Sequence, residues 1–262
     1  MCELFALSAT EPVDIKLSLT ELARHGGDTD IHADGWGVAF LDGRDVRLFR
    51  DSSAAATSPW VACLRDHAIQ SDTVLAHIRH ATQGAITLAN TQPFMRELGG
   101  CMHVFAHNGH LGDTVMADPV GRFQPVGETD SEAAFCRLLE RFVQLPCDTA
   151  ARFDTFAAFA AEMRAKGPAN IICAFDRHLF VHADRRTQRP GVIKPPGLWL
   201  LHRQCGGEHH PAFAGSGVSV GETALNVLLI ASVPLTAEAW RPLARGTALM
   251  VSMGHIVAEQ VV

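Results

Sequence analysis

Two amphipathic helical segments in the middle of the chain, flanked by short apolar runs of strand length, constrain the fold most strongly. Phenylalanine, alanine and leucine recur at helical spacing over residues 131–144 and 150–166. Apolar runs at 73–78 and 102–107 precede the helices, another at 227–231 follows them, and all three are typical of buried strands. This order of strands, helix pair and strands favours a single α+β domain over residues 1–262, in which helices cover layered sheets.

Turn and capping residues indicate where further elements begin and end. Asp42-Gly43 and Asp176-Arg177 each separate two apolar runs, so each predicts a tight hairpin turn. The capping box Ser18-Leu19-Thr20-Glu21 predicts the start of a helix. Residues 83–100 and 184–197 show no regular apolar period, and we expect an irregular segment in the first and a surface loop in the second.

The composition is that of an ordinary globular protein. Hydrophobic residues make up 47% and charged residues 19% of the 262 residues, and the formal net charge is -6. The arginines are dispersed, so no nucleic-acid partner is predicted. No basic N-terminal region precedes a long apolar stretch, so no membrane association is expected. The seven cysteines are odd in number and lack a C-x-x-C pair, which favours reduced thiols and a cytoplasmic location.

The N-terminus offers a candidate nucleophile at Cys2. If Met1 is removed, as we expect from the small side chain of Cys2, a thiol and a free α-amine lie on neighbouring carbons. The pKa of a free thiol is about 8.5 and that of an α-amine about 7.7 to 8.0, so a proton can pass between them near neutral pH. The alternative is that Cys2 is an inert small hydrophobic residue.

Asn108-Gly109 directly follows a predicted strand and could form an oxyanion hole. The asparagine side chain and the unobstructed glycine N–H are both suitable hydrogen-bond donors for a developing oxyanion. The alternative is a type I′ hairpin turn, for which Asn-Gly is a frequent sequence. Residues 111–114 do not continue as a convincing partner strand, which weakens the hairpin interpretation.

Two charged residues could recognise the ends of an amino acid. Arg79 follows the strand predicted at 73–78, where a guanidinium can hold a carboxylate with two hydrogen bonds. Asp130 lies in the first turn of a predicted helix, beside a capping box of Thr129 and Glu132, and could bind an ammonium group. The alternatives are a solvated arginine and a carboxylate favoured by the helix dipole alone.

The fourteen histidines do not predict a metal site, and we expect no metal and no other cofactor. Residues 215–221 contain several glycines but lack the spacing of a dinucleotide-binding fingerprint, so a loop is expected there. The histidine groupings without zinc-site spacing are His77 with His80, His107 with His110, and Cys205 with His209-His210.

Taken together, the motifs resemble those of the class II glutamine amidotransferases, which are N-terminal-nucleophile hydrolases. The resemblance extends from residue 2 to about residue 240, and it is closest to the stand-alone bacterial YafJ-like subgroup. Several motifs in the same order are far more specific than any one of them. These motifs are Cys2-Glu3-Leu4, Asp34-Gly35-Trp36-Gly37, Arg79-His80-Ala81-Thr82, Thr91-Gln92-Pro93-Phe94, Ala106-His107-Asn108-Gly109, Thr129-Asp130-Ser131-Glu132 and Ala231-Ser232-Val233-Pro234-Leu235.

The resemblance implies a four-layer αββα sandwich and a role for each candidate residue. Cys2 would attack the side-chain amide of glutamine, with its own α-amine as the base. The Asn108 side chain and the Gly109 N–H would hold the oxyanion. Arg79 would bind the substrate α-carboxylate, and Asp130 its α-ammonium. The remaining substrate-binding residues that the resemblance implies are Ala81, Thr82 and His107.

The chain also departs from the family pattern. Many amidotransferases begin Cys-Gly, whereas this chain begins with Cys2-Glu3 after Met1. Some relatives have the sequence Arg-Tyr-Ser-Thr where this chain has Arg79-His80-Ala81-Thr82. Ala81 and Thr82 would therefore contact the substrate through their backbones. No synthase domain is expected after residue 262. Three functions stay open: a glutaminase that supplies ammonia to a separate partner enzyme, a hydrolase of γ-glutamyl small molecules, and a non-catalytic binding protein.

Overall fold

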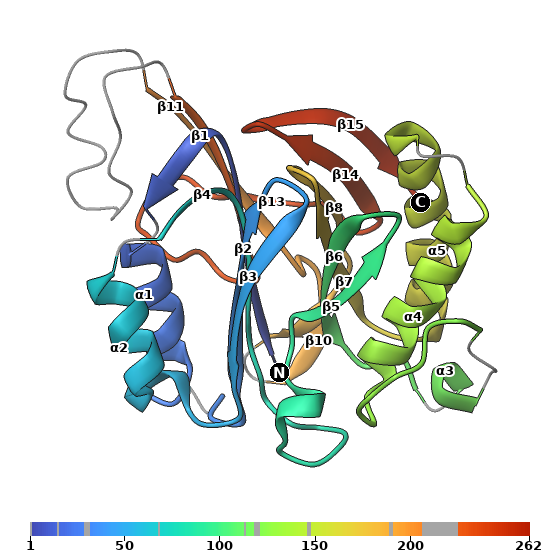
Figure 1. The fold of residues 1–262 in the computed structure, drawn as a ribbon, viewed down its shortest axis with the longest axis horizontal. Coiled ribbons are helices and arrows are strands. Elements are labelled where there is room, and N and C mark those ends of the chain that lie inside the picture. Colours follow the sequence, from blue (N-terminus) through green and yellow to red (C-terminus); the bar gives the residue numbers. More distant parts are fainter. Residues whose placement is uncertain are drawn as a thin grey trace.

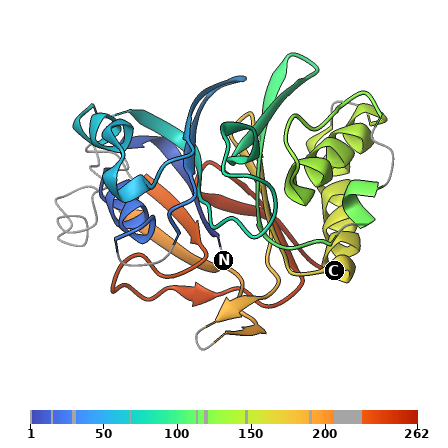
Figure 2. The ribbon, with the colours of Figure 1, turned by 90° about the horizontal axis from the view of Figure 1, so that it is seen from below.

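The structure, a computed structural model, describes residues 2–14, 16–28, 32–67, 69–112, 114–117, 121–145, 148–188, 191–205 and 225–262. Two β-sheets lie face to face in the middle of the molecule, and helices cover the outer face of each (Figure 1). The predicted αββα layering is therefore confirmed. The first described residues lie between the two sheets (Figure 2).

The first sheet is built around the N-terminal strand. Its described strands are β1 (Glu3–Asp14), β2 (Trp36–Asp42), β3 (Asp45–Asp51), β4 (Gln70–Ile78), β11 (Trp199–Cys205), β12 (Leu225–Ala231) and β13 (Arg241–Pro242). They pair antiparallel in the order β13-β11-β12-β1-β4-β2-β3. Because Glu3 pairs with Ile78, the start of β1 lies beside the end of β4. This register brings Cys2 next to the segment that begins at Arg79.

The second sheet carries the Asn108-Gly109 pair. Its described strands are β5 (Phe94–Leu98), β6 (Cys101–Gly109), β7 (Ala169–Phe175), β8 (His178–His182), β14 (Thr247–Ser252) and β15 (His255–Val261). They pair antiparallel in the order β15-β14-β8-β7-β6-β5. Asn108 pairs with Asn170 and Gly109 with Ala169, so β6 continues through both residues. The type I′ turn considered for Asn108-Gly109 is therefore excluded.

The helices form the two outer layers. Helices α1 (Lys16–His25) and α2 (Pro59–Asp66) cover the first sheet, and α4 (Asp130–Val143) and α5 (Thr149–Lys166) cover the second (Figure 1). Short helices are α3 (Thr114–Ala117) and the 3-10 turns Ala55–Thr57 and Leu88–Asn90. Each outer layer encloses its own apolar core, and a third core lies between the sheets. Burial of three apolar layers is the main stabilising contribution in such a fold.

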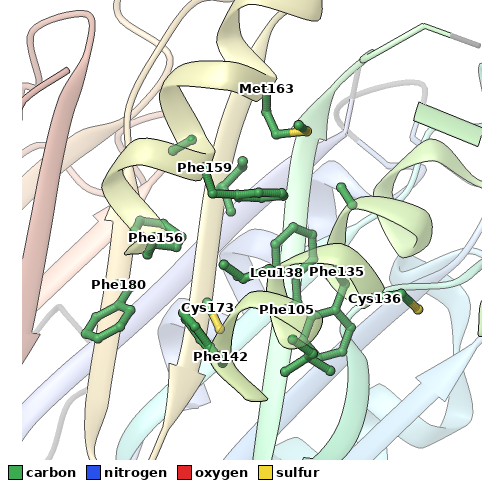
Figure 3. Close-up of a cluster of buried hydrophobic side chains, with 14 of the residues drawn as sticks. Phe105, Phe135, Cys136, Leu138, Phe142, Phe156, Phe159, Met163, Cys173 and Phe180 are labelled. Atoms are coloured by element: carbon green, nitrogen blue, oxygen red, sulfur yellow. The ribbon is translucent and has the colours of Figure 1, made fainter. Parts of the chain in front are cut away.

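Aromatic side chains dominate the core between the second sheet and its helices. Phe180 of β8 makes edge or tilted ring contacts with Phe142, Phe153, Phe156 and Phe175, at centroid distances between 5.0 and 6.4 Å. Figure 3 shows how side chains from α4 and α5 fill the space above the strands. This packing fixes α4, and with it the first-turn residue Asp130, relative to β6.

The alternation of side chains along β6 decides which way the site residues face. Phe105 belongs to the core beneath α4 and α5, whereas Val104 and Ala106 belong to the core between the sheets. Because successive residues of a strand face opposite sides, His107 faces the helices and Asn108 faces the other sheet. The two neighbours therefore reach different partners.

Most of the local predictions are confirmed. Both hairpins form, with positive φ angles at Gly43 in the first turn and at Asp176 and Arg177 in the second. The predicted central helices correspond to α4 and α5, and the side chain of Thr129 caps α4 by accepting a hydrogen bond from the Glu132 N–H.

Three local predictions were wrong, and one lies outside the described residues. Helix α1 begins at Lys16, two residues before the start that the capping box predicted. Segment 83–100 was expected to be irregular, but it contains strand β5, which forms because it pairs with β6. The loop expected at 184–197 holds a small hairpin of β9 (Arg186–Gln188) and β10 (Val192–Lys194). The loop predicted at 215–221 falls outside the described residues.

Candidate functional site

A pocket lies where the start of β1 meets the ends of β4 and β6 and the beginning of α4. It collects residues from five segments that are far apart in the sequence, and six of the eight predicted site residues line it. Those six are Cys2, Arg79, Thr82, His107, Gly109 and Asp130. The other two, Asn108 and Ala81, lie next to lining residues in the chain.

The Cys2 thiol is held by the backbone of a single residue. Its Sγ accepts a hydrogen bond from the His80 N–H at 3.3 Å and donates one to the His80 carbonyl oxygen at 3.4 Å. Burial raises the pKa of the Cys2 thiol, and the His80 N–H opposes that rise by stabilising the thiolate. A thiol with a raised pKa is protonated at neutral pH, so attack requires a base close to Sγ.

The Asn108 side chain is anchored beside Cys2. Its Nδ2 donates to the Cys2 carbonyl oxygen at 2.5 Å and to the Ser232 Oγ at 3.2 Å. Ser232 Oγ also accepts from the Leu4 N–H at 3.0 Å, so one hydroxyl ties β1 and Asn108 together. An oxyanion would have to take the place of one of these oxygens to receive a bond from Nδ2.

Gly109 stands where a larger residue would collide with the neighbouring chain. A Cβ on Gly109 would lie 1.7 Å from the Pro168 carbonyl oxygen and 2.7 Å from the His107 Nε2. Only glycine therefore fits at this point of β6, because the close approach of the Pro168 backbone leaves no space for a side chain. At Gly109 the wall of the pocket is therefore formed by backbone atoms.

Arg79 presents a buried guanidinium to the pocket. The residue is 3% exposed, and its Nη atoms donate to the carbonyl oxygens of Asp34, Gln83 and Gly84 at 3.1 to 3.4 Å. Burial lowers the pKa of Arg79 below its usual range, while the guanidinium stays charged. Among the described residues, no carboxylate forms an ion pair with Arg79. A carboxylate from a bound molecule would supply the missing counter-charge.

Asp130 presents a buried carboxylate to the same pocket. It is 4% exposed and lies in the first turn of α4. Its Oδ2 accepts from the Leu111 N–H at 2.6 Å, and its Oδ1 accepts from the Ser131 Oγ at 3.2 Å. These bonds and the positive end of the helix dipole both favour the charged carboxylate. The pocket therefore combines a fixed positive group and a fixed negative group.

His107 forms one side of the pocket as a neutral ring. Burial lowers the pKa of His107, so the imidazole is uncharged near neutral pH. Its Nδ1 lies 2.9 Å from the Ser131 Oγ, and its Nε2 lies 3.1 Å from the Pro168 carbonyl oxygen. Because Nε2 faces a carbonyl, Nε2 carries the proton, and Nδ1 and the Asp130 Oδ1 then compete for the single hydroxyl proton of Ser131. His107 thus links β6 to the start of α4.

Three residues that hold the site together had no assigned role in the sequence. Asp34 Oδ2 accepts from the Ala81 N–H at 2.8 Å, so that N–H is engaged within the protein. The Gln92 side chain bonds both the N–H and the carbonyl of His107, at 2.6 and 3.2 Å. Ser232 joins β1 to Asn108, as described above. All three residues lie in motifs that resemble the family, and these motifs were the signal by which they could have been found. Their roles could not be predicted, because their hydrogen-bond partners are distant in sequence.

Three buried histidines make the free energy of unfolding depend on pH. Burial lowers the pKa of His77 to about 3, and that of His103 and of His182 to about 4. In the unfolded chain the pKa of each is about 6.5, so the unfolded state binds more protons in the window between these values. The stabilising contribution is therefore fully present above about pH 6.5 and is lost progressively as the pH falls towards about 4.

We expect each of these histidines to contribute a slope of about 1.4 kcal/mol per pH unit between about pH 6 and pH 5. Replacing His77 by leucine should remove its share, because leucine has no proton to gain. Urea unfolding of wild type and His77→Leu at several pH values measures both slopes. Equal slopes in the two proteins would contradict the assignment.

The described residues hold no group of three or more histidine, cysteine, aspartate or glutamate side chains arranged to bind a metal ion. His209-His210 lies outside the described residues. No helix in the described part of the chain is both long and apolar enough to cross a membrane. Five cysteines of the described residues, at positions 2, 63, 101, 136 and 173, are free thiols.

Two layered sheets with helices outside, and a cysteine at the start of an inner strand that lines a pocket, define the N-terminal-nucleophile hydrolase type of fold. Solved structures support this class. The chain superposes with a TM-score of 0.62 on glutamine phosphoribosylpyrophosphate amidotransferase from B. subtilis, at 14% identity, covering 99% of this chain and 49% of that one. At this identity the likeness shows the fold alone.

Closer relatives show the family. The family model of the class-II glutamine amidotransferases matches residues 1–262. YafJ of Escherichia coli strain K12, named as a candidate glutamine amidotransferase, is 42% identical over 186 residues, which are 70% of this chain and 72% of YafJ. A predicted glutamine amidotransferase from Pseudomonas aeruginosa has a TM-score of 0.70 and 32% identity, with 98% and 100% of the two chains covered. The chain therefore belongs to the class-II glutamine amidotransferases and is an amidohydrolase enzyme, and this membership supports cleavage of the glutamine amide.

Proposed function

We propose that this protein, once Met1 has been removed, uses Cys2 to hydrolyse the side-chain amide of glutamine or of a γ-glutamyl small molecule. The observation that carries the proposal is the composition of the pocket. The Cys2 thiol, the Arg79 guanidinium and the Asp130 carboxylate line the same pocket, although β1, β4 and α4 supply them separately. A thiol beside one fixed positive and one fixed negative charge suits an amino acid whose side chain carries an amide.

The two charges match the two ends of a zwitterionic head group. The Arg79 guanidinium would hold the α-carboxylate, because it has no carboxylate partner among the described residues. The Asp130 carboxylate would hold the α-ammonium beside its present partners, which are the Leu111 N–H, the Ser131 hydroxyl and, at 3.5 Å, the His110 Nδ1. Recognition of the head group leaves the side-chain amide as the part that reaches Cys2. Thr82 and Ala81 would add backbone contacts.

The chemical steps follow from the position of the α-amine. This amine would accept the thiol proton as Sγ bonds to the amide carbon, and would return it to the nitrogen as the carbon–nitrogen bond breaks. Ammonia or an amine leaves, and a γ-glutamyl thioester remains on Cys2. Water then attacks the thioester, which releases glutamate and the free thiol. The Gly109 N–H and the Asn108 Nδ2 would stabilise the oxyanion of each tetrahedral intermediate.

We also propose that residues 1–262 form one domain and that released ammonia passes to a separate acceptor enzyme. The inter-sheet core supports a single domain, because it contains residues from β1, β6 and β12 together. The acceptor is inferred from the family, whose name describes the transfer of the amide nitrogen. Hydrolysis of a γ-glutamyl conjugate would need no acceptor, and this difference can be measured.

We expect the purified protein to lack Met1 and to release ammonia from glutamine. Intact mass establishes the N-terminus, and kcat/KM for glutamine is compared with kcat/KM for γ-glutamyl amides of increasing size. A higher kcat/KM for glutamine supports the glutaminase, whereas preference for a bulky amide supports the γ-glutamyl hydrolase. Retention of Met1 together with no turnover of any substrate would overturn the proposal and favour a non-catalytic binding protein.

A further inference from the structure

The position of the Cys2 thiol depends on the backbone of His80. Sγ hydrogen-bonds to His80 at two atoms, its N–H and its carbonyl oxygen. The contact with the carbonyl requires a protonated thiol, whereas the contact with the N–H also stabilises the thiolate. A displacement of the His80 backbone would therefore change both the orientation and the reactivity of Sγ.

His80 lies beyond the last paired residue of β4, and residues 34 and 35 hold its two neighbours. On one side, the Arg79 N–H donates to the Gly35 carbonyl oxygen at 2.8 Å, and the Asp34 N–H donates to the Arg79 carbonyl oxygen at 3.2 Å. On the other side, the Ala81 N–H donates to the Asp34 Oδ2 at 2.8 Å. The Asp34 side chain thus supplies the bond that fixes the backbone after His80.

We infer that Asp34 is a positioning residue, which holds the His80 backbone against the Cys2 thiol through its bond to the Ala81 N–H. The inference rests on the proposed role of Cys2 as the nucleophile. Asp34 does not line the pocket, so it acts through the segment that it holds. The His80 Nδ1 also lies 3.4 Å from the Asp34 Oδ2, but it makes no hydrogen bond there.

The attachment can be tested while the hydrogen bonds of Arg79 are kept, although the nearby Asp34 carboxylate also raises the pKa of Arg79 through its charge. The bonds between residues 34–35 and Arg79 all use backbone atoms of Asp34 and Gly35, including the contact of Arg79 Nη1 with the Asp34 carbonyl oxygen at 3.4 Å. A substitution of the Asp34 side chain therefore removes the bond to Ala81 and leaves these atoms in place. We expect kcat to change more than KM, because the carboxylate-binding residue keeps its supports.

The experiment compares Asp34→Ala and Asp34→Asn with Asp148→Ala as a matched control. Asp148 also accepts a backbone bond, from the Ala150 N–H at 3.0 Å, but it caps α5 at a distance from the pocket. Two quantities are measured in each protein. One is kcat and KM for glutamine, and the other is the rate of alkylation of Cys2 by iodoacetamide, with the exposed thiol of Cys63 as the internal standard.

For Asp34→Ala we expect kcat to fall roughly 10- to 100-fold. Alkylation of Cys2 relative to Cys63 should change as well, and KM should change by less than about threefold. Asp34→Asn should retain most of the activity, because an amide oxygen can replace Oδ2 as the acceptor. Asp148→Ala should lose some stability, because it removes the cap of α5, and should lose no activity.

Two results would overturn the inference. One is an Asp34→Ala protein whose kcat and Cys2 alkylation match those of Asp148→Ala. The other is a folded Asp34→Asn protein whose kcat falls by about tenfold or more, which keeps the test decisive even if the alanine variant does not fold. If Cys2 is not the nucleophile, the Cys2→Ala variant will hydrolyse glutamine as fast as wild type, which is a separate result. The rate of Cys2 alkylation does not depend on turnover, so it tests the role of Asp34 in either case.

Discussion

Cys2→Ala is expected to reduce glutamine hydrolysis roughly 10⁴- to 10⁶-fold, because it removes the atom that bonds to the amide carbon. Alanine at position 2 is also small enough to permit removal of Met1, so the variant keeps the α-amine in place. The Sγ atom hydrogen-bonds to the N–H and the carbonyl oxygen of His80, and its loss should leave the fold intact. Turnover of the purified variant and of wild type, measured at saturating glutamine, gives the ratio directly.

Covalent labelling provides the control for this prediction. A diazoketone analogue of glutamine should add one label to wild type and none to Cys2→Ala. Cys63→Ala removes an exposed free thiol from α2 and should behave as wild type in both turnover and labelling. Labelling that persists in Cys2→Ala, or turnover within about tenfold of wild type, would show that the nucleophile lies elsewhere.

Asn108→Ala has the second largest expected effect. We expect kcat to fall about 10²- to 10³-fold, as is usual when one donor to an oxyanion is removed. KM should stay within about threefold, because Arg79 and Asp130 still bind the head group. The interaction with the oxyanion exists only once the tetrahedral intermediate forms, so its loss appears in kcat. Steady-state kinetics with glutamine separates the two constants.

Ser232→Ala tests whether Asn108 acts on the reaction or on the fold. This variant removes one acceptor of the Asn108 Nδ2 and leaves the Leu4 N–H unpaired, at a cost of about 1 to 3 kcal/mol in the free energy of unfolding. It retains the Asn108 donor itself, so kcat should fall by less than about tenfold. Equal losses of kcat in Ser232→Ala and Asn108→Ala would indicate that Asn108 has a structural role.

The elements that could be predicted are those stabilised within short stretches of sequence. Helix α4 was predicted closely because its apolar residues recur at helical spacing and Thr129 caps its first turn. The hairpin turn at Asp176 and Arg177 was predicted because two apolar runs flank it. Strand β5 was missed, since Phe94–Leu98 acquires its regularity from pairing with β6. Local patterns carry no information about such a partner.

The candidate site shows the same division. Cys2, Arg79, Asn108 and Asp130 could be singled out because thiol, guanidinium, amide and carboxylate groups carry recognisable chemistry at recognisable motifs. Ser232 could not be given a role in this way, because a serine after a strand has many uses. Its function as a link between β1 and Asn108 exists only because β12 pairs with β1.

The amino-acid sequence by itself determined the central helices and most of the strands, the candidate nucleophile and the charged residues suited to an amino acid, because periodicity, capping and side-chain chemistry are local properties. The tertiary structure alone decided that Asn108 and Gly109 continue a strand, that His107 and Asn108 face opposite sides of it, and that Asp34 holds the segment beside Cys2. These features depend on the register of β6 with β7 and on hydrogen bonds between segments distant in sequence. Such contacts form only when the two sheets pack together.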